Sequence, residues 1–81
     1  MIKVTLKTDK RQYISKGESI FEAISNLPVD YTNTKTKGTI TVSKGKKKAE
    51  KFFFAHQLRM QICHPLRRKG LAIVLEKLLN A

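Results

Sequence analysis

Apolar and polar residues alternate from the start of the chain. Ile2, Val4 and Leu6 are apolar, and the residues between them are lysine or threonine. A period of two is typical of a β-strand with one buried face. Residues 8–10 then predict a turn, and residues 11–15 predict a shorter second strand. The pattern therefore indicates an N-terminal hairpin.

A helical period follows this hairpin. Ser19 stands three residues before Glu22, the spacing of a capping box, in which the two side chains satisfy free backbone amides at a helix start. Pro28 restricts the residue before it and ends the helix after about two turns. The apolar residues share one helical face: Ile20, Ala23, Ile24 and Leu27. A helix this short needs a sheet to pack against.

The middle of the chain is polar and then β-like. Residues 30–38 are rich in threonine and lack apolar periodicity, which predicts a flexible loop. Ile40 and Val42 resume the alternation and lead to a turn at residues 44–46. Gly45 can adopt the positive φ that such a turn requires, so a second hairpin with a return strand is expected.

Two periods compete along the return segment. The even-numbered apolar residues favour a strand that continues to Ile62, with Phe53 on its outer side: Phe52, Phe54, Leu58, Met60 and Ile62. A helical spacing connects a different set: Ala49, Phe52, Phe53, His56, Met60 and Cys63. That helix would direct Phe54, Leu58 and Ile62 away from the shared face, so the strand, with Phe52 and Phe54 in the core, is the preferred interpretation.

The last segment predicts a closing helix. Pro65 suits a first helical position, and five apolar residues form a stripe: Leu71, Val74, Leu75, Leu78 and Leu79. Gly70 costs about 1 kcal/mol relative to alanine inside a helix, so the helix begins at Pro65 or only after Gly70. The later start leaves residues 67–69 on a basic turn.

The order β-β-α-β-β-α predicts an α+β fold. It consists of one small single-layer antiparallel sheet with two helices packed on one face and water on the other. The chain of 81 residues is expected to form a single basic domain, 1–81, with one small core. No repeat or second domain is indicated.

The positive charge is concentrated in one part of the chain. The net charge is +11, from 17 lysines and arginines against 6 acidic residues. Residues 35–69 contain eleven of these basic residues and the single acid Glu50, which gives +10 for this stretch and +1 for the remainder. Solubility alone does not require such clustering, so the stretch predicts a negatively charged partner.

Two basic groups and one outer row are candidate nucleic-acid contacts. The lysine-rich turn and the basic turn before the closing helix are expected to contact phosphates, which position a partner without reading its sequence. A solvated hairpin tip that prevents edge aggregation is the alternative for the lysines, and a tolerated basic helix start is the alternative for the second group. Phe53, Gln57, Arg59 and Gln61 on the outer side could also stack on or bond to bases. The predicted contact residues are Lys44, Lys46, Lys47, Lys48, Lys51, Arg59, Arg67, Arg68 and Lys69.

Chemistry at a metal or a nucleophile is not expected. His56, Cys63 and His64 lack the paired spacings of a zinc site, and the interpretation is a buried thiol and two ordinary histidines. The acidic residues form no recognisable catalytic pair, and no phosphate-binding glycine motif occurs. A non-enzymatic protein without a cofactor is therefore predicted.

The predicted location and partners follow from these exclusions. One cysteine and the absence of an apolar leader or a long apolar run predict a cytoplasmic protein in a reducing compartment. Nucleic acid is the preferred partner, with RNA slightly favoured over DNA because no recognition helix for a major groove is evident. The alternative is an interaction module or inhibitor that docks its basic surface on an acidic partner protein. A membrane surface is disfavoured, because the phenylalanines are needed in the core.

Overall fold

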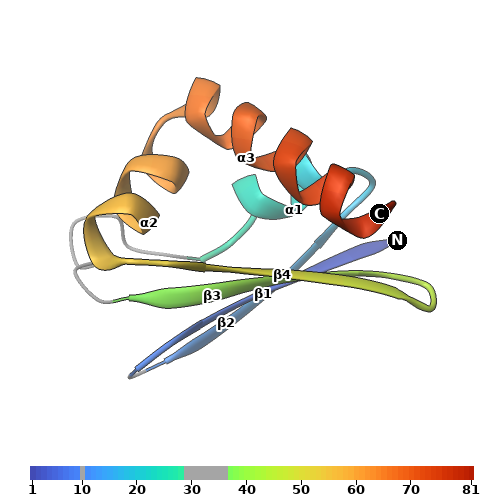
Figure 1. The fold of residues 1–81 in the computed structure, drawn as a ribbon, viewed down its shortest axis with the longest axis horizontal. Coiled ribbons are helices and arrows are strands. Elements are labelled where there is room, and N and C mark those ends of the chain that lie inside the picture. The colour runs from blue at the N-terminus through green and yellow to red at the C-terminus, as the bar shows by residue number, and fades with distance from the viewer. Residues whose placement is uncertain (10, 29–36) are drawn as a thin grey trace.

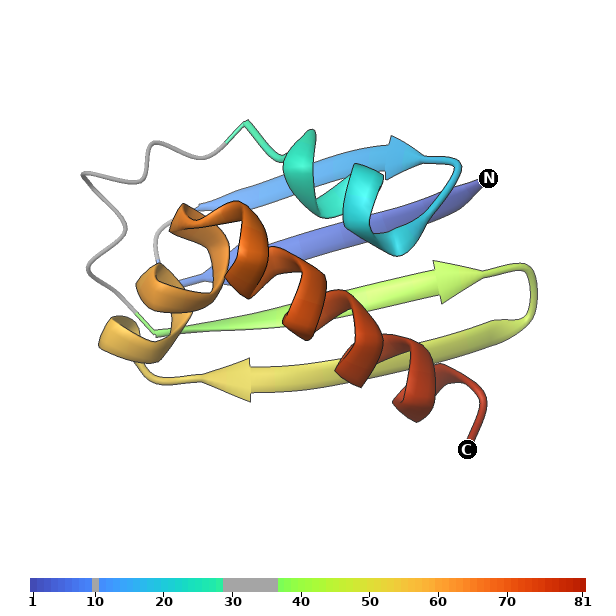
Figure 2. The same cartoon turned by 90° about the horizontal axis from the view of Figure 1, so that it is seen from above.

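The computed structural model describes residues 1–9, 11–28 and 37–81. It is an α+β fold in two layers, with one sheet covered on one face by all three helices (Figures 1 and 2). The predicted order is present, with one additional helix before the last. The elements are β1 (Ile2–Thr8), β2 (Gln12–Gly17), α1 (Ile20–Ser25), β3 (Gly38–Lys44), β4 (Lys47–Phe53), α2 (Ala55–Cys63) and α3 (Pro65–Leu79).

The sheet consists of two antiparallel hairpins side by side, in the order β2-β1-β3-β4. β1 and β3 pair in the centre and join the hairpins. The second hairpin has a two-residue turn at Gly45 and Lys46, between the paired residues Lys44 and Lys47. Gly45 has a φ of 61°, as predicted, and a positive φ at the first central residue alone is the pattern of a type II′ turn.

Helix α1 is held against the end of β2. Ser19 caps the helix as expected, its Oγ accepting a hydrogen bond of 3.1 Å from the backbone N–H of Glu22. The buried Ser15 hydroxyl donates to the carbonyl of Ala23. Gly17 permits this close approach, because a Cβ there would lie 2.7 Å from the backbone nitrogen of Ala23.

The core lies between the sheet and the helices. Alternate residues of β1 and β3 supply its floor, and α3 supplies Leu71, Leu75 and Leu79 at four-residue spacing. Sixteen buried apolar residues of the described ranges form one cluster. They are Ile2, Val4, Leu6, Ile20, Ala23, Ile24, Leu27, Ile40, Val42, Ala49, Phe53, Leu58, Ile62, Leu71, Leu75 and Leu79.

The expectation that the return strand continues to Ile62 is wrong. β4 ends at Phe53, and residues 55–63 form α2, in which Leu58 and Ile62 are buried and Met60 is 51% exposed. Residues 55–61 are alanine, glutamine, leucine, arginine and methionine with one histidine. Strong helix formers therefore predominate in this segment, and none of its seven residues is β-branched. Gln57 Oε1 accepts a hydrogen bond from the backbone N–H of Phe54, one half of a capping box. Helix propensity therefore prevails over the apolar alternation.

The predicted register of the phenylalanines is also wrong. Phe53 is buried at 5% exposure, whereas Phe52 and Phe54 are 49% and 59% exposed. The two-residue turn is the reason, because it pairs even-numbered residues of β3 with odd-numbered residues of β4, and Phe53 comes to lie opposite Gly38. Core-facing residues of β3 are even-numbered, so those of β4 are odd-numbered.

The start of α3 and the start of β3 are two boundaries that the structure defines. α3 begins at Pro65, and the His64 ring nitrogen Nδ1 accepts a 3.3 Å hydrogen bond from the backbone N–H of Leu66. Arg67, Arg68 and Lys69 therefore lie within the helix, and the basic turn expected before it does not exist. Of the predicted loop 30–38, residues 30–36 lie outside the described residues, and Gly38 opens β3.

Candidate nucleic-acid interface

Figure 1 shows one face of the sheet that no described helix covers, here called the open face. The strand registers place three cross-strand rows of residues on it. The strand registers define each row, in the order β2, β1, β3 and β4. The first row contains Lys16, Lys3, Ser43 and Lys48. The second contains Ile14, Thr5, Thr41 and Glu50. The third contains Gln12, Lys7, Thr39 and Phe52.

The first row is a band of positive charge across the whole sheet. Lys3 and Lys16 lie directly opposite each other, and Ser43 separates Lys3 from Lys48. Opposed like charges destabilise a strand pair by a few tenths of a kcal/mol up to about 1 kcal/mol. No acid belongs to the row. The arrangement is therefore suited to an anion that contacts several ammonium groups at once.

The third row ends in an aromatic hollow. Phe52 lines a depression of about 300 Å³ whose charged lining residues are Lys7, Lys37 and Asp9. The rings of Phe52 and Phe54 meet edge to face, with centroids 5.2 Å apart. The first and third rows are separated by four residues of β1, or about 13 Å. One sheet face thus combines an exposed ring, hydroxyl groups and ammonium groups.

Sequence reasoning missed four members of this face. Lys3, Lys7 and Lys16 belong to the part of the chain whose charge is nearly balanced, and Phe52 was assigned to the core. The signal for Lys3 and Lys7 was available, because they occupy the polar positions of an alternating strand. The position of Lys16 opposite Lys3 depends on the pairing of β1 with β2.

The lysines predicted at the second hairpin do not all face one way. Lys48 lies on the open face, and Lys46 lies in the turn. Lys47 is on the helix side, where its Nζ donates a 3.3 Å hydrogen bond to Oδ1 of Asn80. Lys51 is also on that side, with its Nζ 5.8 Å from the centroid of the Phe53 ring. Phe53 and Lys51 thus share a side, as expected, but it is the helix-covered side.

The second predicted basic group lies away from the hairpin tip. Arg67, Arg68 and Lys69 are in the first two turns of α3, at the end of the molecule opposite the turn of the second hairpin (Figure 1). Arg67 and Lys69 are exposed and Arg68 is half-buried. Arg59 belongs to α2, and its side chain lies outside the described part of the structure. The nine predicted residues therefore do not form one surface.

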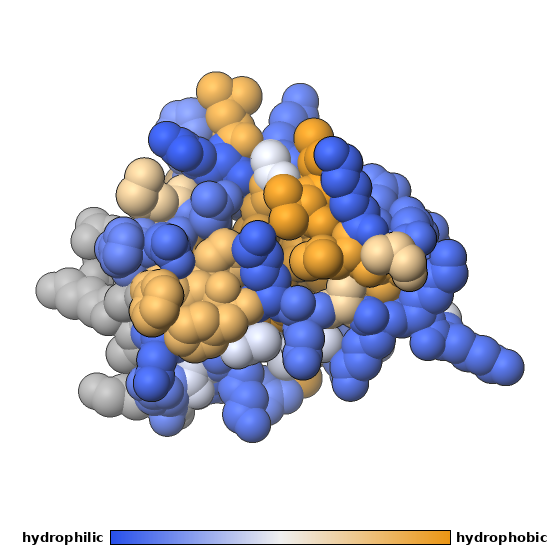
Figure 3. All heavy atoms as spheres, in the orientation of Figure 1, coloured by the Kyte–Doolittle hydropathy of each residue, from blue (hydrophilic) through white to orange (hydrophobic). Residues whose placement is uncertain are grey.

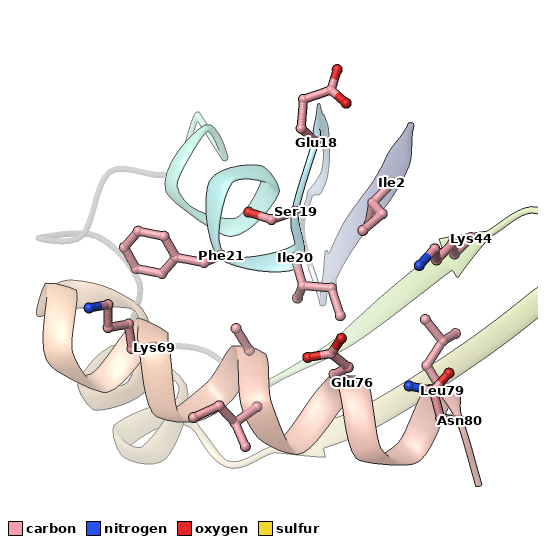
Figure 4. A pocket seen from close by; sticks show the side chains of 12 residues that line it. Ile2, Glu18, Ser19, Ile20, Phe21, Lys44, Lys69, Glu76, Leu79 and Asn80 are labelled. Carbon is pink, nitrogen blue, oxygen red and sulfur yellow. The ribbon is translucent and has the colours of Figure 1, made fainter.

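A cavity of about 570 Å³ lies between α1, α3 and the end of β3 (Figure 4). Its charged lining residues are Lys44, Lys69, Glu18 and Glu76. Glu76 lies between the two lysines. Because carboxylates and ammonium groups alternate around this cavity, it is poorly suited to a phosphate backbone.

The residues considered for metal or nucleophile chemistry are dispersed. Cys63 is exposed, which corrects the expected buried thiol, and His56 and His64 are exposed as well. Within residues 1–9, 11–28 and 37–81, no three His, Cys, Asp or Glu residues gather as a metal site. The helices of these ranges are too short or too polar to cross a bilayer.

Comparisons with known proteins assign no family. No protein-family model, no curated protein sequence and no solved structure matches the chain.

Proposed function

We propose that this protein is a small, non-enzymatic nucleic-acid-binding protein of the cytoplasm, and that it holds the phosphate backbone on the open face of its sheet. The observation that carries the proposal is the row of Lys16, Lys3, Ser43 and Lys48 without an intervening acid. Lys46 stands in the turn at the same end of the sheet, whereas Lys44 lies on the helix side. Neutralising several phosphates releases condensed counterions, which provides affinity without a specific geometry.

Single-stranded RNA is the preferred ligand over duplex DNA. The open face is a sheet with hydroxyl groups and an exposed ring, the combination on which unpaired bases stack in sheet-based binders. Phe52 takes the stacking role that the sequence suggested for Phe53. Arg67, Arg68 and Lys69 lie at the other end of the molecule, so salt screens most of their attraction for RNA held on the lysine row.

Replacing Lys3, Lys16 and Lys48 together with glutamine is expected to weaken binding of single-stranded RNA by roughly ten- to a hundredfold. Each lost phosphate contact lowers the salt slope by about 0.7, so the slope should fall by about 2. Fluorescence anisotropy with an RNA of about ten nucleotides at three salt concentrations measures both quantities.

The matched control is Lys47, Lys69 and Lys77 to glutamine, which removes the same charge from the helix-bearing side. It should change affinity much less than the open-face triple variant. Equal losses in the two variants would show that net charge alone attracts RNA. The absence of RNA and DNA binding by the unmodified protein at low salt would disprove the proposed function.

Phe52→Ala is expected to weaken RNA binding by about 1–3 kcal/mol, the usual contribution of one stacked base. The same variant should bind an abasic backbone of equal length as tightly as the unmodified protein, because only stacking is lost. Phe54→Ala is the control, since it changes a neighbouring exposed ring. An equal loss with the abasic ligand would refute stacking and leave phosphate binding intact.

A further inference from the structure

A second surface lies on the other side of the sheet, between α3 and the edge strand β4. It is a groove of about 300 Å³, and its apolar side chains are the exposed Leu66 and Val74 over the buried Phe53 and Leu71. Figure 3 shows apolar side chains gathering over α3 and β4, surrounded by hydrophilic ones. The described residues that line it are Lys51, Phe53, Gln61, Leu66, Arg67, Gly70, Leu71 and Val74. The groove is distinct from the open face.

Helix α3 has a second apolar stripe that the core does not use. Leu66, Gly70, Val74 and Leu78 follow one another at four-residue spacing, beside the core stripe of α3. Leu66 is 72% exposed, and Val74 and Leu78 are 38% and 44% exposed. Exposed apolar residues that form a contiguous patch with a polar rim are typical of an interaction site.

Gly70 keeps the middle of this stripe open. It lies inside a helix, where glycine is less favourable than alanine. Its φ is not positive, and a Cβ there would meet nothing within 4 Å. The fold itself therefore does not require glycine at this position, and the absent side chain leaves space beside the helix for a side chain of a partner.

β4 supplies the second half of the surface. It is the last strand of the sheet, and its described pairing is with β3 alone. Alternate residues of an antiparallel strand direct their backbone N–H and C=O groups away from the neighbouring strand. An added strand can bond to these groups while its side chains enter the groove alongside.

The charges around the groove indicate what occupies it. Lys51 and Arg67 line it, and none of the lining residues that the structure describes is acidic. A second copy of this chain would bring another +11 charges to the surface and be repelled. The complementary ligand is extended, carries apolar side chains for Leu66 and Val74, and carries a carboxylate for Lys51 and Arg67.

We propose that the groove binds an extended, acidic segment of a partner protein as a strand added to β4. The segment alternates, so that apolar and acidic side chains face the groove while the intervening residues face away. This site is independent of the nucleic-acid face, and the two could be occupied together because they lie on opposite sides of the sheet.

The test uses a labelled peptide, acetyl-Ser-Val-Thr-Asp-Thr-Val-Glu-amide, whose groove-facing positions are Val, Asp and Val. Two control peptides carry Lys in place of Asp, or Pro in place of the Thr that follows it. Proline removes a backbone donor and disrupts strand pairing. The parent peptide should bind at least tenfold more tightly than either control. Its addition should shift the backbone amide resonances of β4 and of the first half of α3, and leave those of β2 unchanged.

Gly70→Leu separates binding from folding. A leucine at this position fills the groove and improves helix propensity, so peptide affinity should fall at least tenfold while the thermal midpoint rises by about 4–8 °C. Val74→Ala should also weaken the peptide, whereas Ile73→Ala, on the neighbouring face of α3, should not. RNA affinity should stay unchanged in all three variants.

Three results would overturn the proposal. Equal affinity for the three peptides would exclude strand addition with charge recognition. Undiminished peptide binding by Gly70→Leu would place the peptide elsewhere. Loss of RNA affinity in Gly70→Leu, with RNA displacing the peptide, would assign the groove to nucleic acid instead of a protein partner.

Discussion

Phe53→Ala is expected to lower the free energy of unfolding by about 3–5 kcal/mol, the usual cost of removing a buried phenylalanine ring. Phe53 is 5% exposed and belongs to the core cluster, where its ring is covered by the helices. Lys51 lies over the same ring and loses a cation–π contact as well. Urea denaturation followed by circular dichroism measures the change.

The adjacent rings provide the control for this prediction. Phe52→Ala and Phe54→Ala should each cost about 1 kcal/mol or less, because both side chains remain about half exposed in the folded state. A larger loss for these two variants than for Phe53→Ala would mean that β4 is shifted by one residue. Such a shift would also move Lys48 from the open face to the helix side.

Leu58→Ala should cost about 2–5 kcal/mol. Leu58 is fully buried where α2 packs beneath α3, and a Cβ at Gly38 would lie 3.0 Å from one of its methyl groups. The surroundings are thus closely packed around this side chain. Removing it leaves a cavity that backbone elements on two sides cannot easily fill. Denaturant unfolding measures the change in stability, provided that the dependence of the unfolding free energy on denaturant concentration is the same for both proteins.

Met60 distinguishes the helix from the strand. In a strand, Leu58, Met60 and Ile62 would share one face and show similar costs of truncation. In α2, Met60 is about half exposed, so Met60→Ala should cost well under 1 kcal/mol. Comparable losses for Leu58→Ala and Met60→Ala would argue against the helix.

Most of the fold could be predicted from the sequence, because local signals and tertiary packing agree along most of the chain. The alternation of Ile2, Val4 and Leu6, the cap at Ser19 and the glycine turn at Gly45 each appear as expected. The placement of the helices on one face follows from having one apolar side per strand. These features depend on residues near one another in the chain.

The errors arose where two periods overlapped. The apolar residues 58, 60 and 62 satisfy a strand period, yet only the first and last are buried in the structure. Helix propensity favours the helix in this segment. That preference is weak, so the sequence alone does not show whether tertiary packing will override it. The register of Phe52 and Phe53 depended on the turn length, which the sequence between residues 43 and 48 leaves open.

The candidate site was the harder problem, because it depends on strand order. Charge counting found Lys48 but assigned equal importance to Lys47 and Lys51, which lie on the helix side. Lys3 and Lys16 join Lys48 only when β1 lies between β2 and β3. Counting charges along the sequence does not reveal the strand order, and the residues of one row are far apart in the chain.

The central pairing of β1 with β3 joins segments that are far apart in the chain, and the lysine row depends on it. Each hairpin closes a short loop, whereas β1 meets β3 only after the intervening chain has lost much more conformational freedom. The lysine row draws on both hairpins, so it exists only after that closure. A polyanion bound across the row would bind only the state in which the two hairpins are paired. It would therefore stabilise that state by mass action once the free polyanion concentration exceeds the dissociation constant.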